Sequence, residues 1–320
     1  MGILSKPVAG IDYPRNLREF DSWFTDEAAC RNYVYRVRWP EGYECGRCRS
    51  RAAPWITARG YLHCRECGGE LSITAGTVFE NTRKPLRSWF HAMWLVTSQK
   101  QGASALGIQR VLGLGSYQTA WTWLHKLRRA MVRPGRQLLS GRVEVDETYV
   151  GGPKEGGKPG RGAEGKEIVV IAVEILAPKG FGRVRMRQVP DVSGKSLLPF
   201  ICEAVEPGTE VLTDAWRGYN RLGRQGYRHS RIVLSASGDP AHVAMPAVHR
   251  IAALLKRWLL GIHQGAVSGK HLGYYLDEYT FRFNRRTSRS RGMLFYRLMQ
   301  QAVTTPSAPY RQLVAGDHNI

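Results

Sequence analysis

The sequence predicts a multidomain α+β protein with a cysteine-rich module, a basic helical region and a C-terminal α/β domain. Two Cys-x-x-Cys pairs stand fifteen residues apart near the start of the 320-residue chain. No Asp or Glu occurs between Asn81 and Val143, whereas arginines and lysines accumulate there on helical patterns. After residue 142, strand-like segments are followed by helical ones, which is typical of a domain with a sheet and covering helices.

The composition favours a polyanionic partner. The chain has 47 Lys and Arg residues against 26 Asp and Glu residues, a formal net charge of +21. Such an excess is typical of proteins that bind nucleic acid, and less often of those that bind an anionic membrane surface. No run of about 18 apolar residues predicts a transmembrane helix, and the first residues lack the apolar core of a signal peptide. We therefore expect a cytoplasmic protein without a membrane partner.

Residues 1–40 predict an N-terminal helical segment. Apolar side chains recur at helical intervals between residues 16 and 38, and one break in the pattern indicates two helices. Asp26 can cap the second helix, and Pro40 ends it.

Residues 41–80 predict a zinc ribbon. Cys45 and Cys48 are followed after fifteen residues by Cys64 and Cys67, a spacing typical of zinc sites. Two tight turns would each direct two thiolates at one point, and four sulfurs complete a closed tetrahedral shell. Because a closed shell leaves no position for water, we expect a structural Zn²⁺ (Zn2+).

Residues 81–138 predict a basic, helix-turn-helix-like DNA-binding region. Pro85 opens one helix, and a second, at about residues 103–112, ends at Gly113. A third helix follows Ser116, which is suited to be its N-cap. A glycine turn between a short helix and a polar, basic one is typical of a helix-turn-helix. The alternative is a helical connector with a solvated basic face.

Basic side chains in this region and in the last predicted helices are candidates for contact with DNA. Lys and Arg supply most phosphate contacts in such complexes. The candidates are Arg110, Lys126, Arg128, Arg129, Arg257, Arg282, Arg285 and Arg286.

Residues 139–302 predict an α/β domain, and residues 303–320 form a C-terminal tail without a readable motif. The expected strands cover residues 142–149, 168–176, 183–189, 210–214 and 231–234, and the expected helices cover residues 195–204, 246–262 and 272–284. A glycine-rich basic loop, residues 151–166, follows the first strand. Three strands, a helix, a strand and further helices resemble the ribonuclease H-like fold.

Two of the expected strands present an aspartate. Asp146 alternates with Val143 and Val145 in the first strand, and Asp214 ends the fourth. Mg²⁺ (Mg2+) prefers carboxylate and water ligands, so two aspartates on separate strands are the minimum for a two-metal phosphoryl-transfer site. Two ions about 4 Å apart polarise a phosphodiester, activate the nucleophile and stabilise the leaving oxygen. We therefore expect Asp146 and Asp214 to bind Mg²⁺ or Mn²⁺ (Mn2+).

Glu144 and Glu147 lie beside Asp146 in the same strand. The two-residue period places Glu144 on the face of Asp146 and Glu147 on the opposite face. For both we expect a structural or solvated role.

The helix expected at residues 246–262 carries His249 and Lys256 on one face. The two differ by seven residues, so they are only about 20° apart around the helix axis. A lone histidine is more often structural than a ligand.

Several motifs in order resemble those of bacterial insertion-sequence transposases with an N-terminal zinc ribbon and an ISXO-type DDE catalytic domain. They are Val-Glu-Val-Asp-Glu-Thr-Tyr-Val-Gly-Gly from residue 143, Thr-Asp-Ala-Trp-Arg-Gly-Tyr from residue 213, Leu-Leu-Lys-Arg-Trp from residue 254, and Tyr-Leu-Asp-Glu-Tyr-Thr-Phe-Arg-Phe-Asn-Arg-Arg from residue 275. The resemblance extends from about Phe20 to Leu298.

This resemblance implies catalytic roles for four residues. Asp146 and Asp214 take the first two acidic positions, and Lys256 matches a lysine that would contact substrate phosphate. The third acidic position falls on His249, where the family commonly has glutamate. Imidazole binds Mg²⁺ less readily than a carboxylate does and suits Mn²⁺ better. Glu278 is the alternative third acid, and an inactive, domesticated copy is a further alternative.

The resemblance implies an enzyme, a DNA transposase that catalyses metal-dependent hydrolysis and transesterification of phosphodiesters. Its implied partners are double-stranded DNA, as the terminal inverted repeats of its element and as target DNA, and further copies of itself in a homodimer or higher oligomer. A bacterial, nucleoid-associated location is implied as well. A catalytically degenerate zinc-ribbon DNA-binding regulator and a ribonuclease H-like nuclease remain as alternatives.

Overall fold

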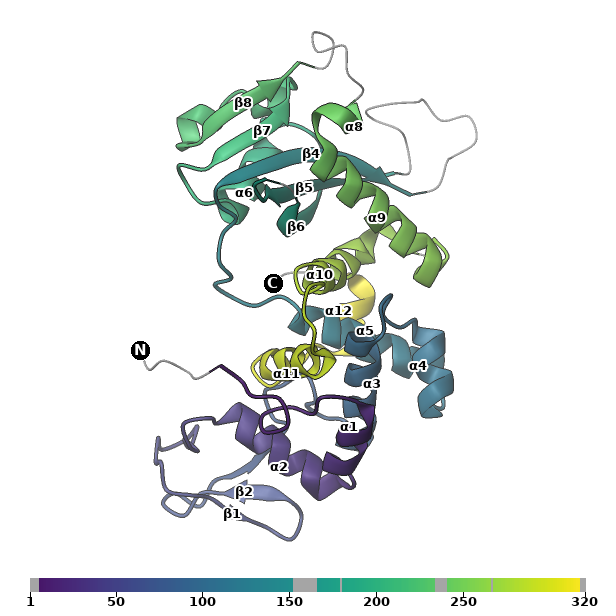
Figure 1. Ribbon diagram of the computed structural model, residues 1–320. Coiled ribbons are helices and arrows are strands. Elements are labelled where there is room, and N and C mark those ends of the chain that lie inside the picture. Colours follow the sequence, from purple (N-terminus) through teal and green to yellow (C-terminus); the bar gives the residue numbers. More distant parts are fainter. Residues whose placement is uncertain (1–5, 152–165, 179, 234–240, 266, 317–320) are drawn as a thin grey trace. The chain divides into compact units, whose positions relative to one another are not determined.

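In the computed structural model, the described chain comprises residues 6–151, 166–178, 180–233, 241–265 and 267–316. It divides into two compact units (Figure 1). The helical unit contains Met1–Arg133 and Thr287–Ile320, and the sheet unit contains Pro134–Arg286. The chain therefore leaves the helical unit, forms the whole sheet unit and then returns. Most of the predicted basic loop, residues 152–165, lies outside the described residues.

The two predicted N-terminal helices are confirmed. Asp26 begins the second as expected, because its carboxylate accepts a hydrogen bond from Ala29 N at 2.8 Å. The helices of this unit are α1 (Leu17–Trp23), α2 (Glu27–Arg38), α3 (Leu86–Ser98), α4 (Ala105–Leu112), α5 (Tyr117–Ala130), α11 (Arg291–Ala302) and α12 (Tyr310–Ala315).

An aromatic cluster forms the core of the helical unit, and α11 completes it. The ring centre of Phe295 in α11 lies 5.4 Å from that of Phe20 in α1 and 5.8 Å from that of Phe90 in α3. Gly292 allows this approach, because a Cβ there would overlap the carbonyl oxygen of Pro14. The sequence placed residues 287–302 in the catalytic domain, whereas α11 belongs to the helical unit, because its apolar face fills this core.

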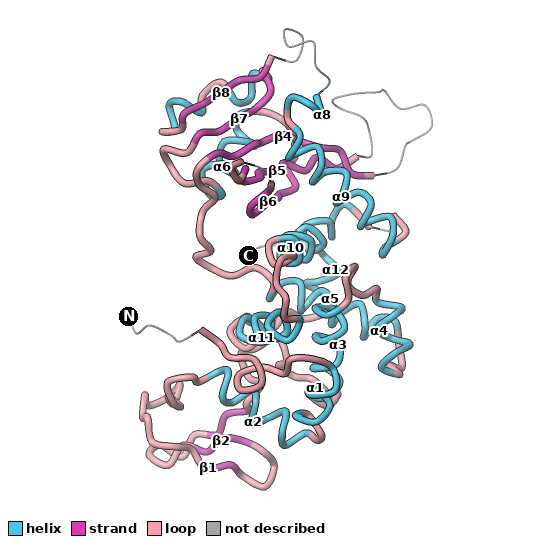
Figure 2. Tube along the Cα trace, viewed as in Figure 1, coloured by secondary structure: helices cyan, strands magenta, loops and turns pink. Residues whose placement is uncertain are grey.

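The ribbon is a three-stranded antiparallel sheet in the order β1 (Trp55–Ile56), β2 (Tyr61–His63) and β3 (Glu70–Ser72) (Figure 2). Gly60 closes the turn between β1 and β2 with a φ of +80°, a conformation that favours glycine. Its N–H donates to Thr57 O at 2.8 Å.

A glycine turn joins α4 and α5, as the sequence predicted. Gly113 ends α4 in a left-handed conformation, and Ser116 caps α5 by accepting from Thr119 N at 3.2 Å. The first turn of α5 reaches the surface, where Tyr117 is 52% exposed. Helix α5 also contacts α12, where the ring centres of Trp121 and Tyr310 lie 6.1 Å apart. Helix α12 lies within residues 303–320, for which the sequence showed no motif.

The sheet unit has the strand topology of the ribonuclease H-like fold, as predicted. Its strands follow the order β6-β5-β4-β7-β8. The first three strands along the chain form an antiparallel meander, and the last two extend the sheet in parallel beyond the first strand. The strands are β4 (Arg142–Val150), β5 (Glu167–Ile175), β6 (Phe181–Val189), β7 (Glu210–Asp214) and β8 (Arg228–Ile232), the last of which begins three residues earlier than expected.

Helices cover both faces of this sheet (Figure 1). Val143 and Val145 of β4 pack with α6 on one face, whereas Val169, Ile171 and Val173 of β5 pack with α9 and α10 on the other. The helical elements are α6 (Gly194–Ala204), α8 (Ala241–Ala244), α9 (Pro246–His263) and α10 (Leu272–Phe283), with short 3₁₀ turns η1 (Arg217–Tyr219), η2 (Leu222–Gln225) and η3 (Gly269–His271). Among the described residues, no helix has the length and apolar character needed to cross a membrane.

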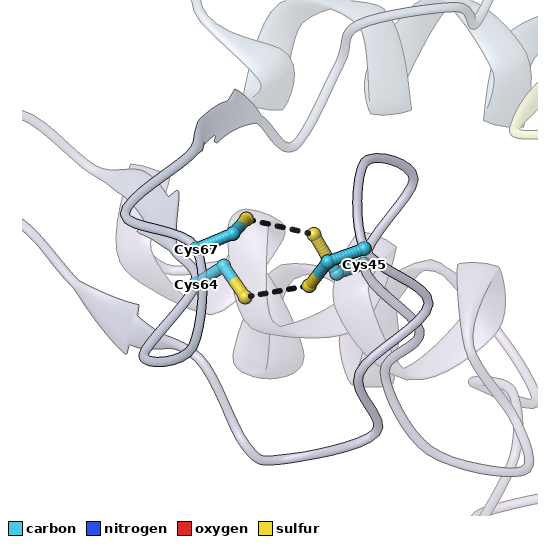
Figure 3. A group of neighbouring side chains, drawn as sticks. Cys45, Cys64 and Cys67 are labelled. Atoms are coloured by element: carbon cyan, nitrogen blue, oxygen red, sulfur yellow. Dashed lines mark hydrogen bonds between the residues drawn. The ribbon is translucent and has the colours of Figure 1, made fainter.

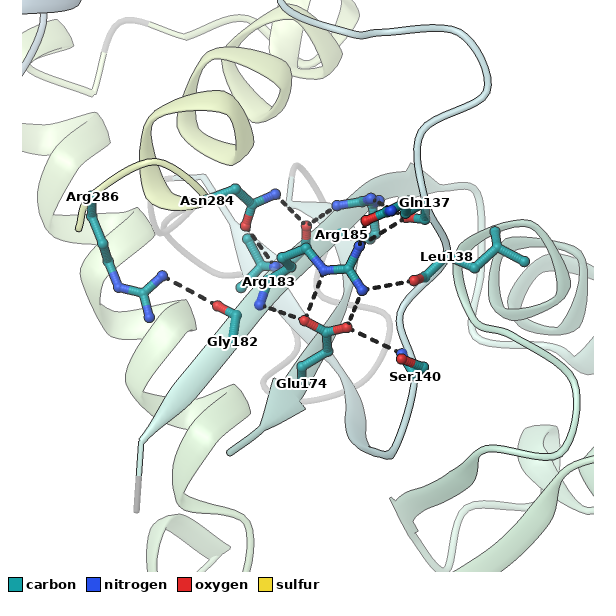
Figure 4. Close-up of polar contacts among 10 residues, drawn as sticks. Gln137, Leu138, Ser140, Glu174, Gly182, Arg183, Arg185, Asn284 and Arg286 are labelled. Atoms are coloured by element: carbon teal, nitrogen blue, oxygen red, sulfur yellow. Dashed lines mark hydrogen bonds and ion pairs between the residues drawn. The ribbon is translucent and has the colours of Figure 1, made fainter. Parts of the chain in front are cut away.

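Side chains from the end of α10 protect the edge strand β6 (Figure 4). The Asn284 amide accepts from Val184 N at 2.7 Å and donates to Val184 O at 3.1 Å, so it pairs with the edge as another strand would. Arg286 donates to the carbonyls of Phe181 and Gly182. On the same strand, Arg183 forms a partly buried ion pair with Glu174.

Candidate active site

The four predicted zinc ligands converge in the ribbon. Cys45 Sγ lies 3.8 Å from Cys67 Sγ, and Cys48 Sγ lies 3.6 Å from Cys64 Sγ (Figure 3). All four sulfurs lie within 4.8 Å of one another, which is the spacing of a tetrahedral Zn²⁺ shell. Backbone N–H groups of Cys48 and Arg47 lower the pKa of the Cys45 thiol to about 6 and so favour the thiolate that zinc requires.

The two predicted catalytic aspartates lie on adjacent parallel strands. Glu144 in β4 is in register with Leu212 in β7. Two residues further along both strands, Asp146 and Asp214 occupy matching positions on the same face. Asp146 is paired on its other side with Ile171, whose side chain belongs to the core beneath α9 and α10. Both carboxylates therefore lie on the face that α9 covers.

Backbone N–H groups orient both carboxylates. Asp146 Oδ1 accepts from Glu147 N at 2.9 Å, and Asp214 Oδ1 accepts from Trp216 N at 3.0 Å. The second contact is a turn in which an aspartate side chain accepts from the backbone two residues later. These contacts orient Asp214 at the end of β7, and Asp146 just beyond the last residue of β4 that pairs with β7.

The structure brings His249 of α9 to the first aspartate. Its Nε2 lies 3.8 Å from Asp146 Oδ2, and the side chains of His249 and Asp146 are 35% and 17% exposed. A partly open position beside a carboxylate is suited to a metal ligand as well as to an ion pair with a protonated imidazole. The three predicted ligands, Asp146, Asp214 and His249, are spread more widely than the four cysteines. Among the described residues, only the four cysteines form a group of three or more potential ligands with all ligand atoms within 4.8 Å.

Glu144 links the strand of Asp146 to the helix of His249. Its Oε2 accepts from Ala247 N at 2.9 Å and from Val248 N at 3.0 Å, in the first turn of α9. Met245 provides no side-chain cap, so this carboxylate satisfies N–H groups that a cap would otherwise bind. Glu144 is only 5% exposed, and burial raises its pKa against the effect of these two hydrogen bonds.

A buried tyrosine supports the same strands from the opposite face. Tyr219 in η1 is fully buried, and its hydroxyl donates to Glu147 Oε2 at 2.9 Å. Burial, together with the negative charges of Glu147, Asp146 and Asp214, raises the pKa of Tyr219 well above its ordinary value. The phenol therefore stays protonated and remains a hydrogen-bond donor.

Lys256 lies two turns after His249 in α9. Partial burial lowers its pKa, and the positive charge of Lys166 lowers it further. The Lys256 side chain as a whole is nevertheless exposed to solvent.

Two family models match the chain, one over the ribbon and one over most of the sheet unit. Residues 25–70 match a transposase zinc-ribbon domain, and residues 138–284 match an ISXO2-like transposase domain. An uncharacterized transposase-like protein of Haemophilus influenzae is 30% identical over 112 residues, which are 35% of this chain and 89% of that protein. The chain belongs to the ISXO2-like transposase family.

Two further proteins are similar to this transposase family member. An uncharacterized protein in transposable element ISH50 of Halobacterium salinarum is 27% identical over 283 residues, which are 81% of this chain and 91% of that protein. The crystal structure of the catalytic core domain of BIV integrase covers 47% of this chain and 86% of its own, with 17% identity and a TM-score of 0.30.

Glu278, the alternative third acid, lies on a different helix of the transposase domain. It is fully buried in α10, which packs on β6. Strand β5 separates β6 from β4, where Asp146 lies, whereas α9 packs directly on β4 and β5. The structure therefore places His249, not Glu278, at the first aspartate.

Several predicted DNA-binding residues have structural contacts. Arg128 is 2% exposed and donates to His125, so it is removed from the surface. Lys126 donates to Ser307, and burial lowers its pKa. Arg129 has a buried guanidinium nitrogen. Helix periodicity missed the Lys126 contact because Ser307 lies 181 residues later in the chain.

The remaining candidates divide between packing and exposure. Arg285 stacks on Phe281 with its guanidinium carbon 3.9 Å from the ring centre, and Arg286 stacks on Phe283 at the same distance. Arg282 is half-buried, whereas Arg110 and Arg257 are exposed. These two are the candidates best placed to reach a DNA backbone.

Proposed function

We propose that the protein is a DNA transposase that binds the ends of its element, cleaves a phosphodiester there and joins the freed strand to target DNA. The observation that carries the proposal is the pairing of Asp146 and Asp214 on adjacent parallel strands, with His249 beside Asp146. Membership of the ISXO2-like transposase family supports the reaction class.

Asp146, Asp214 and His249 would hold two divalent cations. Two carboxylates and an imidazole fit Mg²⁺ or Mn²⁺, and the nitrogen donor favours Mn²⁺. When bound, such ions polarise the phosphodiester and stabilise charge on the attacking and leaving oxygens. Because imidazole replaces a carboxylate, the ligand set has two formal negative charges where a glutamate would give three.

Other residues of the chain would position these ligands and the DNA. The backbone N–H groups of Glu147 and Trp216 hold the Oδ1 atoms of the two aspartates. Glu144 holds the first turn of α9 and with it His249. Lys256, whose positive charge is destabilised by Lys166, would bind a substrate phosphate.

The proposed reaction has two displacements at phosphorus. In the first, a water oxygen bonds to phosphorus at the element end and the bond to the 3′ oxygen breaks, so a 3′-hydroxyl is left on the element. In the second, this 3′ oxygen bonds to a target phosphorus and displaces a target 3′ oxygen. The nucleophile loses its proton to solvent and the leaving oxygen gains one. No covalent protein–DNA intermediate is needed.

The other parts of the chain would recognise and assemble the DNA. We assign end recognition to the zinc ribbon and to the exposed first turn of α5, since recognition helices contact bases with their N-terminal residues. Joining two ends to one target requires at least a dimer on DNA. The place of action would be the nucleoid in the cytoplasm.

Strand transfer with separate Asp146→Asn and Asp214→Asn variants tests this proposal. The substrate is duplex DNA with the element ends, in Mn²⁺ or Mg²⁺. Each variant should lose at least about a thousandfold in rate, equivalent to about 4 kcal/mol of transition-state stabilisation, and still bind DNA. Glu203→Gln is a matched control, because it neutralises an exposed acid on α6 and should leave the rate unchanged.

The outcomes separate the alternatives. Wild-type protein that binds ends but never cleaves them would identify a DNA-binding regulator. Cleavage that ignores the element ends and prefers RNA–DNA hybrids would identify a nuclease. Either result refutes the proposed transposase.

A further inference from the structure

A cavity in the helical unit is lined by four basic side chains from three separate segments. Arg31 comes from α2, Arg59 from the turn between β1 and β2, and Arg83 and Lys84 from the segment before α3. Tyr61 of β2, which is 40% exposed, lies along the same cavity. We call this cavity, with Arg31, Arg59, Arg83 and Lys84, the basic groove.

The four positive charges of the basic groove have no ion-pair partner among the described residues. One carboxylate, Glu27, lines the cavity, but it is used by the backbone. Its Oε1 accepts from Leu86 N at 2.9 Å and its Oε2 from Arg87 N at 3.4 Å, which caps α3.

The part of the ribbon that follows the Cys45–Cys48 turn differs in this respect. The side chains of Arg49 and Arg51 are 83% and 82% exposed, yet both form ion pairs with Glu44. Arg49 Nη1 lies 2.7 Å from Glu44 Oε1, and Arg51 Nη2 lies 3.8 Å from Glu44 Oε2. Among the described residues, Arg49 and Arg51 thus have an ion-pair partner, whereas the four cations of the basic groove have none. Unpaired cations that line a concavity favour an anionic ligand over solvent alone.

The charge of the basic groove favours a polyanion over a small anion. Its four cations come from three separate segments that line one cavity, so a ligand with several negative charges can neutralise more of them than a single small anion can. Gly60 lies beside Arg31, whose Cδ would lie 3.7 Å from a Cβ at residue 60, so the β1–β2 turn and α2 adjoin each other at the cavity. One aromatic side chain lines the cavity, so backbone contact is favoured over base stacking, which uses successive aromatics.

We propose that the basic groove binds the phosphate backbone of duplex DNA, with Arg31, Arg59, Arg83 and Lys84 contacting successive phosphates. This inference rests on the proposed function for its choice of duplex DNA. It assigns sequence-independent contact with DNA to the side of the ribbon that faces α2, rather than to the two cysteine turns or to Lys126, Arg128 and Arg129.

The test compares two double variants that each remove two arginines from the ribbon region. Arg59→Ala/Arg83→Ala removes two of the four cations of the basic groove, and Arg49→Ala/Arg51→Ala is the matched control beside the Cys45–Cys48 turn. Both are made in the full chain with Asp146→Asn, so the DNA is not consumed. Fluorescence anisotropy measures binding to a labelled duplex of arbitrary sequence over a salt series, and zinc content confirms that each ribbon is folded.

The groove variant should bind about tenfold more weakly at low salt, and the slope of log K against log salt should fall by about 2, near 0.9 for each lost phosphate contact. The control should change less than about twofold, because Glu44 already offsets its charges. Arg59→Lys/Arg83→Lys should restore most of the affinity, because phosphate contact needs the charge.

Equal losses in the groove variant and the control would overturn the proposal, and so would no loss in either. A groove variant that loses affinity for single-stranded RNA of the same sequence, but binds the DNA duplex as tightly as before, would also overturn the proposal. Strand transfer by the wild-type chain is scored separately. If it occurs while the groove variant binds normally, only the groove is refuted. If the groove variant loses binding but the wild type never transfers strands, only the proposed function is refuted.

Discussion

The zinc centre and the candidate active site are both predicted to bind metal ions, but they are assembled in opposite ways. The zinc ligands lie within 23 residues of one another, on two turns, and all four sulfurs meet within 4.8 Å. Asp146, Asp214 and His249 come from two strands and a helix spread over more than 100 residues, and they lie further apart.

This difference explains what each site can do. A compact four-sulfur shell excludes water, so its ion stabilises the ribbon and takes no part in reaction. A site spread over a sheet and a helix leaves positions for water and phosphate, but it depends on contacts that hold those elements together. Glu144 makes one such contact, because it binds the backbone of α9 from the strand of Asp146.

The largest effect is expected from loss of zinc. Cys64→Ser, or a strong chelator, should unfold the ribbon, because a structural Zn²⁺ contributes on the order of 10 kcal/mol to folding. Zinc content and near-UV circular dichroism report the change. The sheet unit, which contains the candidate active site, should stay folded, and slow hydrogen exchange in β4 and β5 would show this. Hydrogen exchange that rises equally in the helical and sheet units would contradict the expectation that zinc stabilises the ribbon and not the sheet unit.

A smaller effect is expected from the third ligand position. His249→Ala should slow strand transfer by about a hundredfold, since it removes one ligand and leaves both aspartates. His249→Glu should be active and should shift the preference from Mn²⁺ towards Mg²⁺, because a carboxylate is the harder donor. Rates in each metal measure this shift. An unchanged metal preference in His249→Glu would show that His249 does not bind the ion.

Loss of the Glu144 contact should affect stability and activity together. Glu144→Ala leaves two backbone N–H groups buried without their acceptor and should destabilise the sheet unit by about 2 to 3 kcal/mol. Strand transfer should fall by about 10- to 100-fold through displacement of His249. Glu144→Gln keeps an oxygen acceptor and should recover most of both. Urea unfolding and strand-transfer rates are the measurements, and full activity of Glu144→Ala would exclude a positioning role.

The smallest effect is on pH dependence. Because burial raises the pKa of Glu144 in the folded state, that state binds a proton more readily than the unfolded chain does. The stability that Glu144 contributes should therefore fall as pH rises from the ordinary glutamate pKa through the raised one, and stay constant above it. The difference in unfolding free energy between wild type and Glu144→Gln isolates this trend. A difference that instead grows with pH would mean that the hydrogen bonds outweigh burial.

Much of the fold follows from local patterns in the sequence. Strand alternation and helix periodicity located β4 to β7, α9 and α10 to within a few residues, and the cysteine spacing located the zinc centre. Strand β8 was placed late because its first residues, Arg228 to Ser230, are polar on an edge strand, and only Ile232 and Val233 resemble a buried strand.

The features that the sequence did not reveal depend on distant partners. Lys126 looks like a surface cation until Ser307, 181 residues later, is seen to accept a hydrogen bond from it. Glu144 looks solvated until the first turn of α9, 103 residues later, is seen to donate to it. Ionisable side chains of this kind change role with their partners, and one sequence without its fold gives no sign of those partners.

The return of the chain to the helical unit has a consequence for synthesis on the ribosome. Residues 134–286 form a continuous unit, but the core around Phe20 and Phe90 lacks Phe295 until α11 has been translated. The sheet unit can therefore fold during translation, whereas the earlier-made N-terminal half must wait for the last few dozen residues. Limited proteolysis of stalled nascent chains would detect this order, and early protection of α1 to α3 would exclude it. A premature stop codon near the 3′ end of the gene would thus disable the part of the protein made first.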